Sequence, residues 1–140
     1  MDTYDLSRFI KAQEKQYETA LSEIRKGKKQ SHWMWYIFPQ LAALGRSDTS
    51  RFYGIKDLEE ANAYLKHPLL GKRLEEISNV LLQHPTSNAH TIFGSPDDLK
   101  LRSCMTLFSE APEASPVFED VLKKFFNGKK DPLTLDLLSK

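Results

Sequence analysis

Apolar residues recur every three or four positions between residues 6 and 24, with glutamate and lysine between them. This spacing is typical of an amphipathic helix with one buried face. Asp5 is placed to cap the start of the helix, and Gly27 to end it. Arg25 and Lys26 fall in the last turn, where cations suit the helix dipole. The pattern therefore predicts a first helix that ends just before Gly27.

The decapeptide Ser31–Gln40 is apolar at most positions after His32 and contains both tryptophans. Ser31 can cap a short helix, which must end at Phe38 because that residue precedes a proline. A buried strand is the alternative, because aromatic and β-branched residues also favour strands. No second segment of comparable quality exists for such a strand to pair with. We therefore favour a central, enclosed helix.

The rest of the chain predicts further short helices separated by prolines and glycines. Residues 41–55 are rich in turn-forming residues, and we interpret them as an ordered loop. Helix starts are expected at Asp57, Pro68, Ser95-Pro96, Val117 and Asp131-Pro132. About seven short helices predict an all-α fold: a compact single-domain multihelical array over residues 1–140, not a simple up-down bundle.

Composition narrows the classes of function. With 40% apolar and 28% charged residues, the chain is typical of a soluble globular protein. The net charge of +1 argues against a globally basic nucleic-acid binder. The single Cys104 excludes an intramolecular disulfide and a multi-cysteine zinc site. The chain has neither a long apolar run nor a signal-like N-terminus, so we expect a cytoplasmic protein without a membrane partner.

Candidate chemistry gathers at the start of the decapeptide. His32 stands beside the tryptophans, where an imidazole can transfer a proton or contact a phosphate. Lys28 and Lys29 precede it, and together with Ser31 and the helix start they can hold an anion. The alternative is a solvated helix end, with a histidine that bonds only to backbone. The sequence leaves both interpretations open.

The aromatic side chains of the decapeptide have two interpretations as well. Most are expected in the core, but Trp35 and Tyr36 carry polar N–H and O–H groups that need partners. Either ring can also stack on a nucleobase or nicotinamide. Gln40 lies close by in sequence and completes the group of candidate ligand-binding residues.

Lys100 and Ser103 form a second candidate pair, because residues three apart share one face of a helix. A serine beside a desolvated lysine can act as a nucleophile with its base. Alternatively, the lysine lies at the surface and the serine bonds back to its own helix. Cys104 falls on the apolar face and is expected to be buried. His84 and His90 lack a second ligand at metal-binding spacing, and we expect neither a metal nor a cofactor.

Several stretches of the sequence together carry a resemblance to a known family. They are Lys29–Gln40, Tyr64–Leu74, Ile92–Gly94 and Lys100–Phe108, with Asp5–Phe9, Phe126–Gly128, Asp131 and Thr134. With these stretches the chain resembles a bacterial family known as domain of unknown function 1810, some of whose members carry the label calpastatin. The resemblance implies a mostly α-helical single domain in a bacterial cytoplasm, and it implies no established activity. Cys104 stands where the family usually has a second serine, which argues against a shared nucleophilic thiol.

Two functions remain as hypotheses, and the sequence does not decide whether the protein is an enzyme. The first is a site for an anionic, nucleotide-like or ADP-ribose- or NAD-related small molecule. The second is a non-enzymatic protein–protein interaction or regulatory module, which should expose a contiguous apolar patch. A pocket shared by His32, Lys100 and Ser103 would favour the first. In that hypothesis the catalytic candidates are His32, Ser103 and Lys100, and the ligand-binding candidates are Lys28, Lys29, Ser31, Trp35, Tyr36 and Gln40.

Overall fold

The structure is a computed structural model of the chain and describes residues 5–139. In that range the chain forms nine α-helices and one 3-10 helix, η1, and the only β-type pairing is an isolated parallel bridge between Leu41 and Ile55. The all-α prediction is confirmed. The elements are α1 Ser7–Lys26, α2 Met34–Ile37, η1 Ala42–Leu44, α3 Asp48–Phe52, α4 Leu58–Lys66, α5 Leu70–Gln83, α6 Ala89–Phe93, α7 Asp97–Ser109, α8 Val117–Phe126 and α9 Pro132–Leu138.

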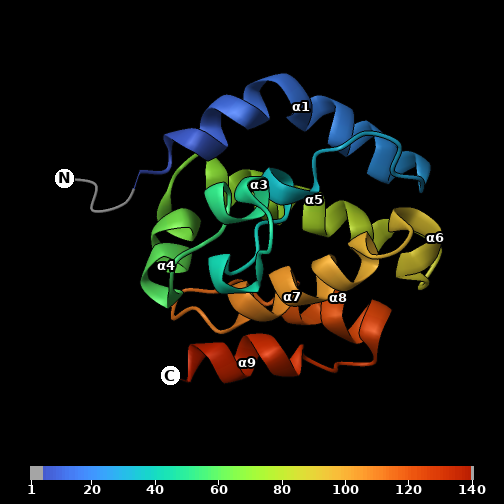
Figure 1. Cartoon of the computed structure of the whole chain (residues 1–140). Helices are drawn as coiled ribbons and strands as arrows, with labels where there is room; N and C mark the ends of the chain where they lie inside the picture. The colour runs from blue at the N-terminus through green and yellow to red at the C-terminus, as the bar shows by residue number, and fades with distance from the viewer. Residues whose placement is uncertain (1–4, 140) are drawn as a thin grey trace.

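The helices surround one hydrophobic cluster. In Figure 1, α1 runs across the top of the view and α9 along the bottom, with α5, α7 and α8 between them. α1 packs on α2 and α5, whereas α7 packs on α4, α6, α8 and α9. None of the described helices is long and apolar enough to cross a membrane. The largest side chains that are almost completely buried include Trp33, Tyr64, Phe9, Phe38, Phe108 and Phe118.

Several helix ends follow the sequence signals directly. Gly27 ends α1 in the left-handed conformation, with φ +81°, and its N–H donates to the carbonyls of Glu23 and Ile24. Such a φ suits glycine because it carries no Cβ. α8 has the predicted bounds, and Asp131 caps α9 by accepting the N–H of Thr134 at 3.1 Å. These predictions are confirmed.

Both faces of α7 are covered, which the sequence did not indicate. The apolar side chains predicted for its buried face lie in the core: Leu101, Cys104, Met105 and Phe108. On the opposite side, the Thr106 hydroxyl accepts the N–H of Asp131 at 2.9 Å, and Ser103 donates to the Asp131 carboxylate at 3.2 Å. Arg102 also donates to the carbonyls of residues 129 and 130. The polar stripe of α7 is therefore where the segment leading into α9 docks.

Several local predictions are wrong. The N-caps of α1 and α7 are Leu6 and Pro96 instead of Asp5 and Ser95. Only Met34–Ile37 of the decapeptide is helical, because the backbone of residues 30 and 31 turns toward a carboxylate of α1 instead of entering a helix. Residues 41–55 are not a plain loop but contain η1 and α3, and a Ser47–Ser50 capping box starts α3. α5 begins at Leu70 rather than at Pro68, because the His67 ring accepts the N–H groups of residues 69 and 70.

Candidate functional site

The carboxylate of Glu23 positions the loop that carries the candidate residues. Its Oε1 accepts the backbone N–H of Gln30 at 2.8 Å, the N–H of Ser31 at 2.9 Å and the indole N–H of Trp33 at 2.9 Å. Its Oε2 accepts the Ser31 hydroxyl at 2.6 Å. One side chain of α1 thus satisfies four donors of the loop. Lys29, within the same loop, also donates its backbone N–H to the carbonyl of residue 92 at 2.7 Å.

The ionisation of Glu23 follows from these contacts. Burial by itself would raise the pKa of this carboxyl. The hydrogen bonds from the Ser31 hydroxyl, two backbone N–H groups and the Trp33 indole outweigh burial and lower the pKa to about 2. Glu23 is therefore ionised at neutral pH, although the residue is buried. Ser31 is a predicted ligand-binding residue, but its N–H and its hydroxyl both donate to Glu23.

Two lysines meet one carboxylate beside this loop. The Lys29 ammonium lies 2.8 Å from Oδ2 of Asp97, and the Lys100 ammonium lies 3.1 Å from Oδ1 of the same side chain. The side chains of Lys29, Asp97 and Lys100 are only 8%, 18% and 21% exposed, so these ion pairs are shielded from solvent. Asp97 begins α7, and Lys100 follows it by one turn.

A small pocket opens at this triplet, and we name it the basic pocket. It has a volume of about 90 Å³ and is lined by Lys29, His32, Met34, Trp35, Asp97 and Lys100. The Lys100 ammonium lies 3.8 Å from the centre of the Trp35 ring, as in a cation–π contact. The Lys29 ammonium lies 5.1 Å from the centre of the buried Trp33 ring.

The basic pocket has an excess of positive charge. Burial would raise the pKa of Asp97, but the ammonium groups of Lys29 and Lys100 lower it below its usual value. Asp97 therefore stays ionised and balances one of the two lysines. The neighbouring Asp98 lies 3.6 Å from the ring of His90. The side chains of Lys29, Lys100 and Asp97 together carry a net charge of +1.

The structure brings some of the sequence candidates together and separates others. His32, Lys29, Trp35 and Lys100 share the basic pocket. Lys28 lines a different groove, of about 380 Å³, beside α1. Gln40 uses its backbone carbonyl to accept the N–H of residue 55 at 2.7 Å, next to the isolated bridge. The Tyr36 ring packs against the Tyr53 ring in a tilted arrangement, with centroids 5.1 Å apart. These three residues are not among the side chains that line the pocket.

Ser103 lies on another side of α7. Its hydroxyl donates to the Leu99 carbonyl at 3.2 Å and to the Asp131 carboxylate at 3.2 Å. The serine that bonds back to its own helix is therefore the observed arrangement, and Ser103 is not among the residues that line the basic pocket. The sequence hypothesis of a Ser103–Lys100 nucleophile and base gains no support from this geometry.

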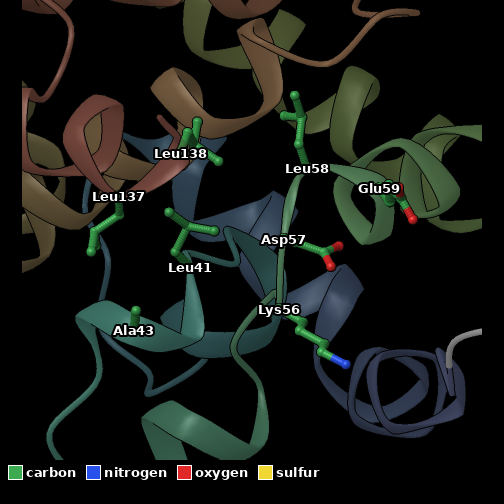
Figure 2. A pocket seen from close by; sticks show the side chains of 8 residues that line it. All are labelled: Leu41, Ala43, Lys56, Asp57, Leu58, Glu59, Leu137 and Leu138. Carbon is green, nitrogen blue, oxygen red and sulfur yellow. The ribbon is translucent and has the colours of Figure 1, made fainter. Parts of the chain in front are cut away.

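A second hollow, of about 340 Å³, lies between η1, the start of α4 and the end of α9. Leu41 and Ala43 face the last turn of α9 across it, whereas the charged ends of Lys56, Asp57 and Glu59 point to the other side (Figure 2). Leu58, Leu137 and Leu138 complete its wall. We name it the leucine hollow. None of the candidate site residues predicted from the sequence lines it.

Two important residues escaped the sequence analysis. Neither Asp97 nor Glu23 is among the candidate residues predicted from the sequence. Asp97 is far from Lys29 in sequence, and no local pattern links them. Within residues 5–139, no group of three histidine, cysteine, aspartate or glutamate side chains is arranged to hold a metal ion.

The fold and the basic pocket define an all-α protein with a charged site between the loop after α1 and the start of α7. The chain belongs to the family described as "Protein of unknown function (DUF1810)", whose model matches residues 3–138. The chain is also similar to the crystal structure of the conserved hypothetical protein Rv1873 from Mycobacterium tuberculosis, with 47% identity, 99% coverage of both chains and a TM-score of 0.96. A comparison with curated proteins gives no match.

Proposed function

We propose that the basic pocket binds the anionic group of a small molecule. The observation that carries this proposal is the triplet of Lys29, Asp97 and Lys100, in which two shielded ammonium groups share one carboxylate. A ligand with one negative charge would balance the remaining positive charge. Both ammonium groups are already held in place, so the ligand would not have to order flexible lysine side chains.

The size of the basic pocket restricts what enters it. A cavity of about 90 Å³ is well below the several hundred Å³ of a site that encloses a drug-sized ligand. It suits a group such as a phosphate, a sulfate or a carboxylate. A nucleotide or an ADP-ribose-like compound would therefore place only its phosphate in the pocket and the rest of its structure on the adjoining surface. His32, which is exposed at the rim, would donate a hydrogen bond to such a phosphate.

The proposal concerns binding and includes no reaction. Isothermal titration calorimetry with inorganic phosphate, adenosine monophosphate and ADP-ribose would test it. Lys100→Gln removes one charge from the pocket, and we expect it to weaken binding of all three probes roughly tenfold, because charge-assisted hydrogen bonds are among the strong ones. His32→Ala should weaken them by a smaller factor.

Lys28→Ala is the matched control. Like Lys100→Gln, it removes one positive charge. Lys28 lies at an exposed position of the loop that carries Lys29 and His32, and its side chain lines the neighbouring groove instead of the basic pocket. Lys28→Ala should leave affinity nearly unchanged. Equal losses in Lys28→Ala and Lys100→Gln would indicate general attraction by surface charge, and the pocket would then not be the site.

The leucine hollow supports a second candidate function, the interaction module. Leucine side chains from three separate segments surround a space of about 340 Å³ that is open to solvent, and such a surface suits an apolar side chain of a partner protein. A photo-crosslinking residue at the exposed Ala43 would capture that partner. The same residue at Lys11, on the exposed face of α1, is the control. Capture from both positions alike would contradict this candidate.

A further inference from the structure

We infer that the rings of Tyr36, Tyr53 and Phe52 form a stacking platform for a planar aromatic ring of the ligand whose anionic group occupies the basic pocket. This inference rests on the proposed function and adds the chemical class of the ligand: a small phosphate or carboxylate that also carries an aromatic ring. We name the three residues the aromatic platform.

Phe52 is the most exposed of the large apolar side chains that the structure describes, at 58%. Its ring meets the Tyr53 ring edge-on, with centroids 4.8 Å apart and an interplanar angle of 81°. A phenylalanine ring that stays largely in water forgoes most of the stabilisation that its burial would give. An apolar side chain in that position suits contact with another molecule.

The platform is continuous and firmly held. The Tyr53 ring lies 5.1 Å from the Tyr36 ring and is tilted by 57° against it, so the three side chains form a row of mutually inclined rings. A planar ligand ring would stack on the face of one of them. The backbone around Phe52 is fixed, because Arg8 donates to the carbonyls of Phe52 at 2.7 Å and Gly54 at 2.9 Å. The capping box at the start of α3 fixes the other end of that segment. Rings held this way lose little freedom when a ligand stacks on them.

One end of the platform contacts a residue of the basic pocket. The Tyr36 hydroxyl donates to the backbone carbonyl of His32 at 3.3 Å, and the His32 side chain lines the pocket. A ligand with its phosphate beside His32 therefore meets Tyr36 next. Charge and aromatic surface adjoin here, and this combination is what binding sites for nucleotide-like compounds present.

Trp35, the other stacking candidate from the sequence, is less suited to this role. The Lys100 ammonium covers one face of its ring at 3.8 Å, and the same ammonium is held by Asp97. A planar ligand ring could reach that face only by displacing the lysine and its ion pair. Among the described residues, no cation–π contact involves the rings of Tyr36, Tyr53 or Phe52.

The occupant is a small molecule rather than a nucleic-acid strand. The basic pocket holds one phosphate-sized group, and the net charge of the chain is only +1. Strands bind along grooves that present a positive charge for each of several phosphates. One charged pocket beside one row of rings matches one phosphate and one ring.

Isothermal titration calorimetry with adenosine monophosphate, ribose 5-phosphate and inorganic phosphate tests the platform. Ribose 5-phosphate carries the same anionic group without the aromatic ring. We expect adenosine monophosphate to bind roughly tenfold more tightly than ribose 5-phosphate, as one stacked base implies. Phe52→Ser and Phe52→Leu should each remove most of that difference and leave the affinity for ribose 5-phosphate unchanged. Phe52→Leu keeps the apolar volume but removes the aromatic face.

Leu133→Ser is the matched control, because Leu133 is 55% exposed and lies on α9, outside the platform. It should change no affinity. Equal binding of adenosine monophosphate and ribose 5-phosphate, with both weakened by Lys100→Gln, would overturn the platform and leave the proposed function standing. Loss of both affinities in the Phe52 variants would also overturn it. No binding of any of the three probes, or no effect of Lys100→Gln, would refute the proposed function itself.

Discussion

Replacement of Glu23 by glutamine should destabilise the protein and loosen the loop that carries Lys29 and His32. The carboxylate accepts four hydrogen bonds, at 2.6–2.9 Å, from the loop and from Trp33. A glutamine has the same shape, but its amide NH2 group would face the Ser31 hydroxyl and its neutral oxygen would accept more weakly. Charge-assisted hydrogen bonds are roughly twice as strong as neutral ones.

The pKa shift of Glu23 and its four hydrogen bonds each indicate how much stability this replacement removes. A fall in the pKa of Glu23 from 4.5 to about 2 corresponds to roughly 3 kcal/mol of stabilisation at neutral pH. A loss of about 0.5–1 kcal/mol at each of four hydrogen bonds gives roughly 2–4 kcal/mol, less what glutamine saves in dehydration. We therefore expect Glu23→Gln to lower the free energy of unfolding by about 2 kcal/mol, or about 7 °C in Tm for a chain of this size.

The pH dependence gives a sharper test. The pKa of Glu23 is lowered in the folded state, so its contribution is complete above about 4.5 and is lost as the pH falls toward 2. In urea unfolding at pH 7 and pH 3, the wild type should lose more stability than Glu23→Gln between the two pH values. Glu14→Gln, at an exposed position of the same helix, is the control and should follow the wild type. Wild-type stability of Glu23→Gln at pH 7, with an unchanged pH dependence, would contradict this stabilising role of the Glu23 carboxylate.

Three further predictions concern other parts of the structure. Gly27→Ala should cost about 2–3 kcal/mol in the free energy of unfolding, because φ is +81° and the new Cβ would lie 2.3 Å from Nε2 of His84. Gly128→Ala, with φ +75° but only an ordinary contact with Lys123 at 3.8 Å, should cost about 1 kcal/mol, and equal losses would contradict the clash. Lys124→Met should lower the free energy of unfolding, measured in urea, by about 1–3 kcal/mol, because the Lys124 ammonium donates to carbonyls at the C-terminal end of α5. Lys123→Met, at an exposed position, is the control and should lower it little. Cys104 should react with a thiol reagent only after unfolding, because it is fully buried and burial raises its pKa; rapid reaction of the folded protein would contradict this.

Local signals in the sequence were sufficient for most helix ends. Gly27, the Val117–Phe126 segment and Asp131 end or begin helices as predicted, because capping and backbone preference act within a few residues. The decapeptide shows where such signals fail. Ser31 has the residue type of a helix cap, but its N–H and hydroxyl both bond to Glu23, eight residues earlier. Hydrogen bonds to Glu23 of α1 thus take the place of the predicted helix cap at Ser31.

The candidate site also combines features that the sequence predicted with features that depend on tertiary contacts. The sequence alone determined that His32, the lysines before it and the aromatic residues after it lie together, because chain connectivity keeps neighbours close. Packing of the helices brings Lys29 and Lys100 together at Asp97, whereas Lys28 and Ser103 have other surroundings. Adjacent residues diverge because successive side chains leave the backbone in different directions, and distant residues converge because the core packs α7 beside the loop after α1. The sequence thus shows which chemical groups are present and where several helices begin and end, whereas packing of the helices decides which groups share a pocket.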